Sequence, residues 1–515
     1  MTAQRPPTDT LMPGGTQTMD HASQLIQERS APPATLVIFG ASGDLTRRKL
    51  LPAVESLARH ERLPDQFALV GVARTPMTDE RFAESALGEH GLASKRQLRG
   101  GVRYVAGGYD DPETYKRLVE TLDELDARRG TSGNRLFYLS TPAGAFEPVI
   151  NGLAGVGLNQ PREGSFSRLV IEKPYGRDLV TARELDGVVH SAFDEHQVFR
   201  IDHYLGKDTV QNVLALRFAN SIFQPIWDRS WVDHVQITVA ETLGVGTRGG
   251  FYEDAGAMRD IVQNHVLQVL ALALMEPPAS FEAEGLRNEK VKLLQAIRLP
   301  TDRDIAEAAV RGQYTRGGTR EELMAGYREE AGVDPLSRTE TYAAMRLNVD
   351  NWRWAGVPFY VRTGKRLPAR LTEVALQFQR PPHLPIPTDQ LTGLEADALI
   401  LRIQPNEGIS LRFGAKVPGH SFRVRTATME FSYDQTFVEE SPEAYERLLL
   451  DALIGDASLF IRSDEVQQCW RIVDPIIENW AKDNSPIPTY EAASWGPTDA
   501  DRLIGRHGRK WRNSA

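Results

Sequence analysis

A short apolar run that leads straight into a glycine-containing turn is the feature that most restricts the fold of this chain. Residues 35–39 read TLVIF, which is typical of a strand buried on both faces, and residues 40–46 read GASGDLT. A helical pattern follows, and further short apolar runs at 67–73, 136–139 and 169–171 alternate with helical stretches. This alternation predicts an α/β fold with a Rossmann-like, doubly wound parallel sheet.

The second part of the chain has a different pattern. Residues 231–240 and 399–404 alternate polar and apolar side chains, which indicates a sheet with one face open to water. We expect an α+β unit with a large, mostly antiparallel sheet. A single hydrophobic core stops growing at roughly 250–300 residues, so this chain should form more than one domain. We predict a flexible tail at 1–33, a Rossmann-like NADP-binding domain at 34–203, and a substrate-binding and oligomerisation domain at 204–515.

The composition excludes several classes of protein. Hydrophobic residues make up 41% and charged residues 25%, which is ordinary for a globular chain. The net charge of −9 argues against a general attraction to nucleic acid phosphates. One cysteine, Cys469, excludes an intrachain disulfide and a thiolate metal cage. We see no targeting segment and no apolar run of membrane-spanning length, so we expect a cytoplasmic location and neither nucleic acid nor membrane as a partner.

The glycine turn at 40–46 suits a nucleotide. Glycines let the backbone approach a pyrophosphate, whose charge then lies on the free N–H groups at the start of the next helix. The spacing departs from G-x-G-x-x-G, so a plain turn between strand and helix is the alternative. Arg74 ends the second predicted strand, where NAD-binding proteins usually place an acidic residue. Together with Arg47 and Arg48, it favours NADP, with NAD as the weaker alternative, unless these arginines are merely solvated.

Four segments carry a resemblance to a known family. GASGDLT at 40–46, EKPYG at 172–176, RIDHYLGK at 200–207 and RDIVQNH at 259–265 occur in the order seen in glucose-6-phosphate dehydrogenases. The resemblance implies oxidation of D-glucose 6-phosphate at C1 to 6-phospho-D-glucono-1,5-lactone, with hydride transfer to NADP⁺. That reaction is the first step of the oxidative pentose phosphate pathway. The resemblance also implies a homodimer or a homotetramer.

The same resemblance implies roles for individual residues. His265 would be the base that removes the proton of the C1 hydroxyl, with Asp202 as its carboxylate partner. The residues implied to bind the substrate are Lys173, His203, Tyr204, Lys207, Glu241, Asp260 and Lys365. The residues implied to bind the cofactor are Gly40, Ser42, Gly43, Asp44, Leu45, Arg47, Arg74, Tyr138 and Lys173.

The residue types support these roles independently. A neutral histidine is a suitable base because its pKa lies near working pH, and a carboxylate on its far nitrogen fixes the tautomer. A phosphate dianion requires cations and charge-assisted donors, which His203 and Lys207 can supply four residues apart.

The stretch 258–276 is expected to form a buried helix, because most of its surface is apolar. At ~100° per residue, Asp260, Asn264, His265 and Gln268 share an arc of roughly 140°. A polar arc on a buried helix predicts the wall of a cavity, while a satisfied core histidine is the alternative. We expect no metal site, because the chain has no His-x-x-x-His pair and no cysteine cluster.

One departure from the family concerns a second, structural NADP that many animal members carry. A Lys and an Arg that hold it correspond here to Leu371 and Ala375, although Arg402 and Gln404 match another wall of that site. We therefore predict that this second site is absent or weak.

Two other functions compete with this interpretation. The first is a related oxidoreductase with an EKP motif that acts on another sugar or on inositol, and a requirement for a phosphate on the substrate would separate the two. The second is a nucleotide-binding regulatory protein that has lost catalysis. Against the latter, the proposed base, its carboxylate, the phosphate-binding residues and Lys173 are all present.

Overall fold

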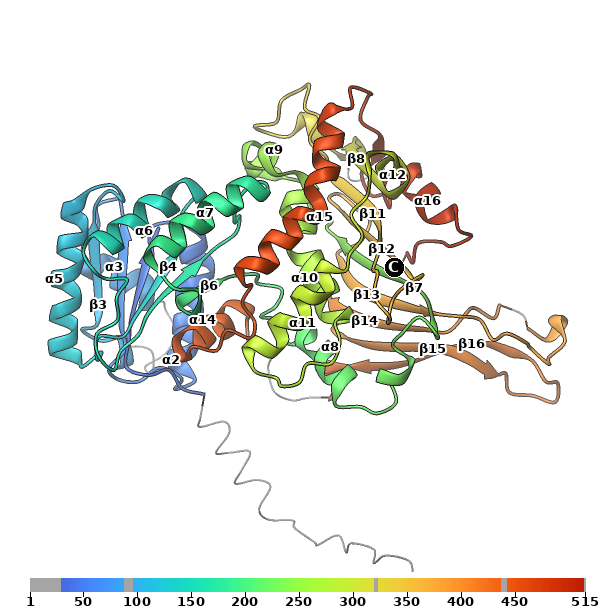
Figure 1. Ribbon diagram of the computed structural model, residues 1–515, viewed down its shortest axis with the longest axis horizontal. Coiled ribbons are helices and arrows are strands. Elements are labelled where there is room, and N and C mark those ends of the chain that lie inside the picture. The colour runs from blue at the N-terminus through green and yellow to red at the C-terminus, as the bar shows by residue number, and fades with distance from the viewer. Residues whose placement is uncertain (1–28, 88–95, 319–322, 392, 437–441, 514–515) are drawn as a thin grey trace, which may run out of the picture.

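The computed structural model describes residues 29–87, 96–318, 323–391, 393–436 and 442–513. It contains two units, one built on a six-stranded sheet and one on a nine-stranded sheet, with long helices between them (Figure 1). Most of the predicted tail, residues 1–28, lies outside the described residues. Among the helices that are described, none is both long enough and apolar enough to cross a lipid bilayer.

The first sheet is parallel throughout, in the strand order β3-β2-β1-β4-β5-β6. This confirms the predicted doubly wound sheet. The order reverses at β1, which pairs with β2 on one side and β4 on the other, so the turn after β1 lies at the switch point where such sheets bind ligands. The strands are β1 (Thr35–Phe39), β2 (Ala68–Ala73), β3 (Val102–Ala106), β4 (Arg135–Leu139), β5 (Ser167–Ile171) and β6 (Val198–Arg200).

The helices of this unit follow ordinary capping chemistry. The Asp111 side chain accepts a hydrogen bond from the N–H of Glu113 at the start of α5, and Gly130 ends that helix with a φ of 71°. The segments are η1 (Thr46–Leu50, wound as a π-helix), α2 (Leu51–Arg59), α3 (Asp79–Leu87), α5 (Pro112–Arg129), η2 (Ala143–Ala145), α6 (Phe146–Gly155), α7 (Leu179–Ala192) and η3 (Glu195–Gln197).

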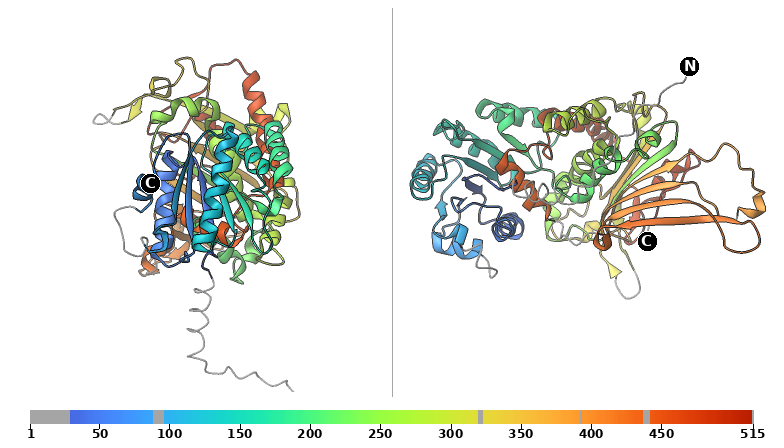
Figure 2. Two further views of the ribbon diagram at one scale, coloured as in Figure 1. Left: turned by 90° about the vertical axis from the view of Figure 1, so that its left-hand side faces the viewer. Right: turned by 90° about the horizontal axis from the view of Figure 1, so that it is seen from below.

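The second sheet has the order β16-β15-β14-β13-β7-β12-β11-β8-β17, and only the pairs β7–β12 and β8–β17 are parallel. The predicted mostly antiparallel sheet is thus confirmed. Its long strands β14 to β16 extend away from the body of the protein (Figure 2). The strands are β7 (Val232–Ala240), β8 (Ala309–Thr315), β11 (Tyr342–Asn348), β12 (Pro358–Gly364), β13 (Leu371–Phe378), β14 (Ala398–Gln404), β15 (Gly408–Lys416), β16 (Val424–Ser432) and β17 (Thr489–Glu491), with a separate hairpin of β9 (Gly317–Gly318) and β10 (Leu323–Met324).

The prediction that one face of β7 is open to water is wrong. The strand exists, but its polar residues His234, Gln236 and Thr238 are buried. The Gln236 amide donates to the carbonyl of Lys510 at 3.0 Å and accepts from the N–H of Arg512 at 2.8 Å. The polar face is therefore covered by the end of the chain, which satisfies it with hydrogen bonds, and this cover could not be read from the strand alone.

Helices from the second part of the chain pack on both units. The indole of Trp470 on α15 donates to the carbonyl of Tyr175 at 2.9 Å, and Arg168 on β5 donates to the last carbonyls of α14. The helical segments are α8 (Asp208–Phe218), η4 (Gln224–Ile226), η5 (Gly246–Arg248), α9 (Gly249–Ala257), η6 (Met258–Val266, wound as a π-helix), α10 (Leu267–Leu274), α11 (Ala283–Gln295), α12 (Asp302–Ala308), η7 (Tyr327–Glu329), η8 (Thr388–Gln390), α13 (Tyr433–Thr436), α14 (Ala444–Ile454), α15 (Ser463–Lys482) and α16 (Thr498–Gly505).

Buried donors hold the end of the η6–α10 helix. The last carbonyls of a helix have no partner within the helix, so when they are buried they need donors from elsewhere. Four consecutive carbonyls here are satisfied by three side chains: Arg217 donates to Leu272 at 3.2 Å and to Met275 at 2.7 Å, Trp227 to Ala273 at 2.8 Å, and Trp354 to Leu274 at 2.8 Å.

We predict that Trp354→Phe lowers the free energy of unfolding by about 2 kcal/mol or more, because it leaves the buried Leu274 carbonyl without a donor and opens a small cavity. The matched control is Trp352→Phe, since Trp352 is 97% exposed and should change stability by less than about 0.5 kcal/mol. The urea midpoint of each full-length variant measures the difference. Equal midpoints for the two variants would show that the indole does not anchor this helix.

Candidate active site

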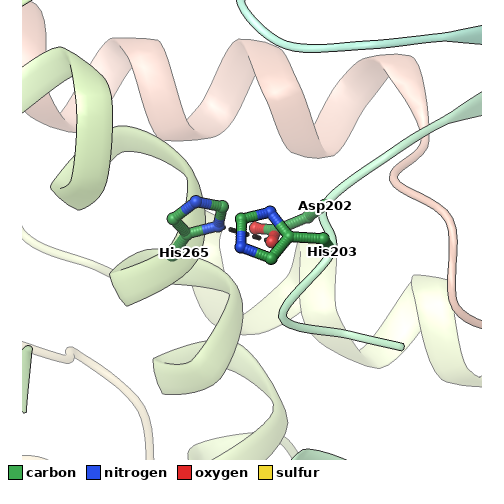
Figure 3. A group of neighbouring side chains, drawn as sticks. All are labelled: Asp202, His203 and His265. Atoms are coloured by element: carbon green, nitrogen blue, oxygen red, sulfur yellow. Dashed lines mark hydrogen bonds and ion pairs between the residues drawn. The ribbon is translucent and has the colours of Figure 1, made fainter. Parts of the chain in front are cut away.

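A buried histidine and a buried aspartate form the centre of the site. Asp202 follows β6, His265 lies on η6, and each side chain is at most 1% exposed. His265 Nδ1 lies 2.5 Å from Asp202 Oδ1, as the dashed line in Figure 3 shows. The same oxygen accepts the N–H of Tyr204 at 2.9 Å, which fixes the carboxylate. The pair predicted from sequence is therefore in contact.

The charges of this pair are set by burial and by its neighbours. Burial alone would raise the pKa of Asp202, but the charge and hydrogen bond of His265 outweigh it and hold that pKa at about 2. Burial lowers the pKa of His265; Asp202 opposes this effect, while Lys173 adds to it. At neutral pH the site thus holds a carboxylate and a neutral imidazole, the combination that a general base requires.

Lys173 contacts the free nitrogen of the imidazole. Its Nζ lies 3.0 Å from His265 Nε2, 3.1 Å from Asp260 Oδ1 and 3.0 Å from the Asp260 carbonyl oxygen. Because an ammonium can only donate, His265 Nε2 accepts and Nδ1 carries the proton toward Asp202. This tautomer leaves a lone pair on Nε2, facing the region between EKPYG and η6.

His203, Tyr204 and Lys207 form a compact cluster beside the pair. The Tyr204 ring stacks on the His265 ring with centroids 4.3 Å apart, and the His203 ring meets His265 edge to face at 4.6 Å. Lys207 Nζ lies 4.4 Å from the centroid of the Tyr204 ring. The turn that carries RIDHYLGK therefore presents two groups able to bind an anion next to the imidazole.

The two basic side chains of this cluster, His203 and Lys207, both have lowered pKa values. Burial and the neighbouring His265 place the pKa of His203 well below its usual value. Burial and Arg370 lower the pKa of Lys207 to about 8. Each group would bind a proton more tightly with a dianion beside it, so anion binding and protonation should support each other here.

Two residues near Lys207 were missed by the functional assignment from sequence. Gln404 accepts from Lys207, and its amide donates to Tyr204 at 3.3 Å. Arg370 donates to Gln404 at 3.5 Å. Gln404, which the sequence assigned to a wall of the second nucleotide site, thus supports the anion-binding cluster. Its local sequence at 403–407 carries no signal for this role, because that sequence does not tell which loop lies opposite.

Glu241 and Lys365 meet because β7 and β12 are parallel neighbours. Ala240 pairs with Gly364 at their carboxyl ends, so the residues that follow leave the sheet side by side. Lys365 Nζ forms an ion pair with Glu241 and lies 5.0 Å from the centroid of the Tyr252 ring. Lys365 also lowers the pKa of Asp260, whose burial would raise it, so these groups share one polar region.

Tyr138 lies under the site rather than on its surface. It is 1% exposed, and its hydroxyl donates to Glu172 Oε1 at 2.6 Å. Tyr445 on α14, which the sequence did not single out, also hydrogen-bonds Glu172 and stacks on His203 with centroids 6.1 Å apart. Glu172, the residue before Lys173, is thus held by two tyrosines from distant parts of the chain.

The glycine turn has the geometry expected of a nucleotide loop. Gly40 has a φ of 85°, and a Cβ there would lie 2.1 Å from the carbonyl oxygen of Ser140. The Thr46 hydroxyl donates to the Gly40 carbonyl at 3.0 Å, which explains a threonine where the usual pattern has glycine. Asp44 and Leu45 begin the following helix, so their N–H groups face the turn.

The arginines of this loop differ in their partners. Arg48 pairs with Asp44 at 2.8 Å. Within the described part of the chain, no carboxylate pairs with Arg47 or Arg74, and both side chains are exposed. Ser42 and Thr75 connect the glycine turn to the end of β2 through their hydroxyls, 3.4 Å apart. The loop therefore offers two cations to a ligand bound at the switch point.

The polar arc predicted on residues 258–276 is only partly correct. Residues 258–266 are wound as a π-helix, so the 100° spacing does not hold there. Asn264 and Gln268 line a small cavity of about 30 Å³ together with Lys173 and Cys469. Gln268 itself is fully buried and accepts a hydrogen bond from Lys290 at 3.1 Å.

The site also brings together three side chains of types that can bind a metal ion: Asp202, His203 and His265. Their ligand-type atoms all lie within 4.8 Å of one another (Figure 3). The contact between His265 Nδ1 and Asp202, however, already accounts for one nitrogen and one oxygen of the group. The expectation of no resident metal stays a prediction.

Two family models match the chain in the order of its two units. Residues 37–212 match "Glucose-6-phosphate dehydrogenase, NAD binding domain", and residues 214–512 match "Glucose-6-phosphate dehydrogenase, C-terminal domain". The chain belongs to the glucose-6-phosphate dehydrogenase family. It is therefore an oxidoreductase with a nicotinamide dinucleotide-binding domain, as the resemblance implied, and both competing interpretations lose their support.

Similar proteins cover almost the whole chain. Glucose-6-phosphate 1-dehydrogenase 2 of Mycobacterium tuberculosis is 49% identical over 492 residues, which cover 94% of this chain and 95% of that protein. Glucose-6-phosphate 1-dehydrogenase of Aggregatibacter actinomycetemcomitans is 48% identical over 483 residues, 93% of this chain and 97% of that one. A solved glucose-6-phosphate dehydrogenase in complex with its substrate glucose-6-phosphate superposes with a TM-score of 0.85 at 34% identity, covering 94% of this chain and 99% of the other. The crystal structure of glucose-6-phosphate 1-dehydrogenase from Mycobacterium avium superposes with a TM-score of 0.80 at 36% sequence identity, covering 94% of this chain and 99% of the other.

We predict that the pKa of His265 moves in opposite directions when its two neighbours are replaced. Asp202→Asn should lower it, because the carboxylate favours the imidazolium, and Lys173→Met should raise it, because the ammonium disfavours the imidazolium. Histidine nitrogen shifts followed by NMR against pH, assigned by their loss in His265→Asn, measure this pKa. A pKa that is the same in all three proteins would contradict the electrostatic account of the pair.

Proposed function

We propose that this dehydrogenase oxidises D-glucose 6-phosphate at C1 to 6-phospho-D-glucono-1,5-lactone with NADP⁺, the opening reaction of the oxidative pentose phosphate pathway. One observation carries the proposal: a neutral imidazole, oriented by a buried carboxylate, accepts from Lys173 at Nε2 and packs against the ring of His203. The sugar ring would lie between Lys173 and the cluster of His203, Tyr204 and Lys207, and the solved relative with glucose-6-phosphate supports the choice of sugar.

His265 would take the proton of the C1 hydroxyl on Nε2. The imidazolium formed in this way shares its Nδ1 proton with Asp202, whose negative charge stabilises it. Lys173 must give up its contact with Nε2 when the hydroxyl arrives, and Asp260, its other partner, keeps it nearby. Lys173 then supplies positive charge next to the oxygen as that oxygen loses its proton.

The substrate phosphate would be bound by His203, Tyr204 and Lys207, with Gln404 orienting Lys207. Arg370 lies close enough to lower the pKa of Lys207 and would add charge. Glu241, Asp260 and Lys365 would hydrogen-bond the sugar hydroxyls from the other side. This arrangement fixes the ring at both ends, which places C1 against His265.

The nucleotide loop fits a 2′-phosphorylated dinucleotide. The Gly40 turn leaves no room for a Cβ, the start of η1 offers N–H groups to a pyrophosphate, and Arg47 and Arg74 are exposed cations without a described partner. Ser42, Gly43, Asp44 and Leu45 would line the pyrophosphate. The chemistry that the nicotinamide supplies when bound is acceptance of the hydride from C1. No step in this scheme requires a metal ion.

We further infer a homo-oligomer. Met429 on β16 and Phe422 in the connection between β15 and β16 are exposed apolar side chains, on the part of the sheet that extends from the body (Figure 2). Such a face is a common subunit interface.

The direct test follows the rise of reduced-nicotinamide absorbance with matched substrates and cofactors. We expect glucose 6-phosphate with NADP⁺ to react, and glucose to have a kcat/KM lower by about a thousandfold, because the phosphate contacts are charge-assisted. NAD⁺ should serve less well than NADP⁺, and Arg74→Gln should remove most of that difference. Reduction of neither cofactor by a folded protein would reject the proposal, and equal rates with glucose would reject the phosphate cluster.

We also predict that His265→Asn and Asp202→Asn lower kcat by roughly a thousandfold while the KM for glucose 6-phosphate changes by less than about threefold. The phosphate contacts remain in both variants, so binding should persist. In the wild type, activity should fall as pH drops through the His265 pKa, since a protonated imidazole cannot accept a proton, and burial puts this limb below the usual histidine range. His383→Asn, on an exposed side chain, is the control. Full activity of His265→Asn would exclude it as the base.

A further inference from the structure

Asn264, the residue before His265, has both ends of its carboxamide bound to the backbone of its own helix. Its Nδ2 donates to the carbonyl oxygen of Arg259, five residues earlier, at 3.2 Å. Its Oδ1 accepts the backbone N–H of His265 at 2.6 Å. One side chain thus connects a carbonyl of one turn with an amide of the next, and that amide belongs to the proposed base.

These two bonds lie inside the stretch that departs from α-helical winding. Met258–Val266 is wound as a π-helix, in which an N–H reaches back five residues instead of four, and such turns are rare and frequent at functional sites. A side chain that inserts into the ladder of backbone hydrogen bonds distorts a helix locally, and asparagine readily bonds to nearby backbone groups. The carboxamide of Asn264 therefore accounts for the wide turn at this place.

The contacts of the imidazole depend on this winding. One extra residue in a turn rotates the side chains beyond it by about 100° around the helix axis. From this turn His265 points toward Asp202, with its Nδ1 2.5 Å from Asp202 Oδ1 (Figure 3). The Asp260 carbonyl on the same turn accepts from Lys173 Nζ at 3.0 Å, and that Nζ also lies 3.0 Å from His265 Nε2. The partners of both ring nitrogens thus follow from how the turn is wound.

We propose that Asn264 is a positioning residue, whose carboxamide fixes the wide turn and thereby sets the His265 imidazole on Asp202. The same turn presents the Asp260 carbonyl to Lys173. The inference rests on the proposed function, in which His265 accepts the proton of the C1 hydroxyl. Among the described residues, the hydrogen bonds of this carboxamide go only to the backbone of its own helix, so it acts on the base through the turn and not by proton transfer.

The test compares Asn264→Ala with the wild type in the full-length protein. A small displacement of a reacting group can cost about a hundredfold in rate, so we expect kcat for glucose 6-phosphate to fall about a hundredfold. The KM should change by less than about threefold, because the proposed phosphate contacts are untouched. The pKa of His265, followed by NMR, should fall, because Asp202 raises that pKa and its contact with the imidazole is weakened.

A double-mutant cycle separates positioning from a general loss of stability. The charged groups that face the imidazole are Asp202, Lys173 and Asp260, and Asn264→Ala changes none of them. In Asp202→Asn the imidazole no longer lies against a negative charge, so adding Asn264→Ala should lower the pKa of His265 no further.

The matched control is Asn220→Ala, at the other end of α8 from Lys207. The Asn220 carboxamide also donates to helix carbonyls, those of Ala215 at 3.2 Å and Leu216 at 3.3 Å. Its replacement removes similar hydrogen bonds and should leave both kcat and the pKa of His265 unchanged.

A second variant, Asn264→Asp, keeps the test decisive if Asn264→Ala does not fold. Aspartate matches asparagine in size and still accepts the N–H of His265, but it has an oxygen in place of the donor toward Arg259. We expect kcat to fall about tenfold, the usual effect of one lost hydrogen bond, and the added negative charge should raise the pKa of His265. Wild-type kcat in Asn264→Asp would show that the bond to Arg259 does not hold the turn.

Three results would overturn the proposal. Wild-type kcat and a wild-type pKa of His265 in folded Asn264→Ala would show that the carboxamide does not position the base. A lower kcat with an unchanged pKa would assign Asn264 to a contact with substrate or cofactor. An undiminished further fall of the pKa in the Asp202→Asn background would show that the effect does not pass through the carboxylate.

Failure of the proposed function gives a different result. A wild-type protein that does not oxidise glucose 6-phosphate would reject that function, and the NMR comparison, which needs no turnover, would still decide whether Asn264 places the imidazole against Asp202.

Discussion

The hydrogen bond between His265 and Asp202 is the interaction on which the site depends, because both groups are almost completely buried. A buried carboxylate is stable only with a close partner, and removing that partner typically costs about 3–5 kcal/mol. The two residues lie 63 positions apart, so the bond requires the first sheet and the η6–α10 helix to be placed against each other accurately. That helix is held at its start by Glu340, which accepts from the N–H of Met258, and at its end by buried donors. The geometry of the His265–Asp202 pair thus rests on anchors at both ends of one helix.

The surroundings of this pair come from four distant stretches of chain. The EKPYG segment supplies Lys173 and Glu172, and the RIDHYLGK turn supplies His203, Tyr204 and Lys207. The second sheet contributes Gln404 at the end of β14, and α14 brings Tyr445 onto Glu172. The helices α14 and α15 also pack back on the first unit, through hydrogen bonds that involve Arg168 and Trp470. The site is therefore a property of the junction and of neither unit alone.

Part of this arrangement could be predicted from residues alone. The parallel sheet followed from short apolar runs, and the family followed from four segments in order. The resemblance implied the pairing of His265 with Asp202, and the chemistry of the two residue types supports it. Local pattern failed where a tertiary contact overrides it: the polar side of β7 is covered by the end of the chain, and the π-helical winding of 258–266 changes which side chains share a face. Gln404 and Tyr445 were missed because their function depends only on what lies opposite them.

The residues along the chain indicated the fold class and the family, and they named the candidates proposed here as base, carboxylate partner and cationic ligands. The fold class follows from periodicity, while the family and the site candidates follow from the resemblance of four short segments, and both signals are local. Only the tertiary structure decided the tautomer and charge of His265, the support of Lys207 by Gln404, and the position of Tyr138 under Glu172 rather than on the cofactor surface. The reason is physical: pKa values and hydrogen-bond partners depend on burial and on distances across the fold, and neither is encoded in the spacing of residues along the chain.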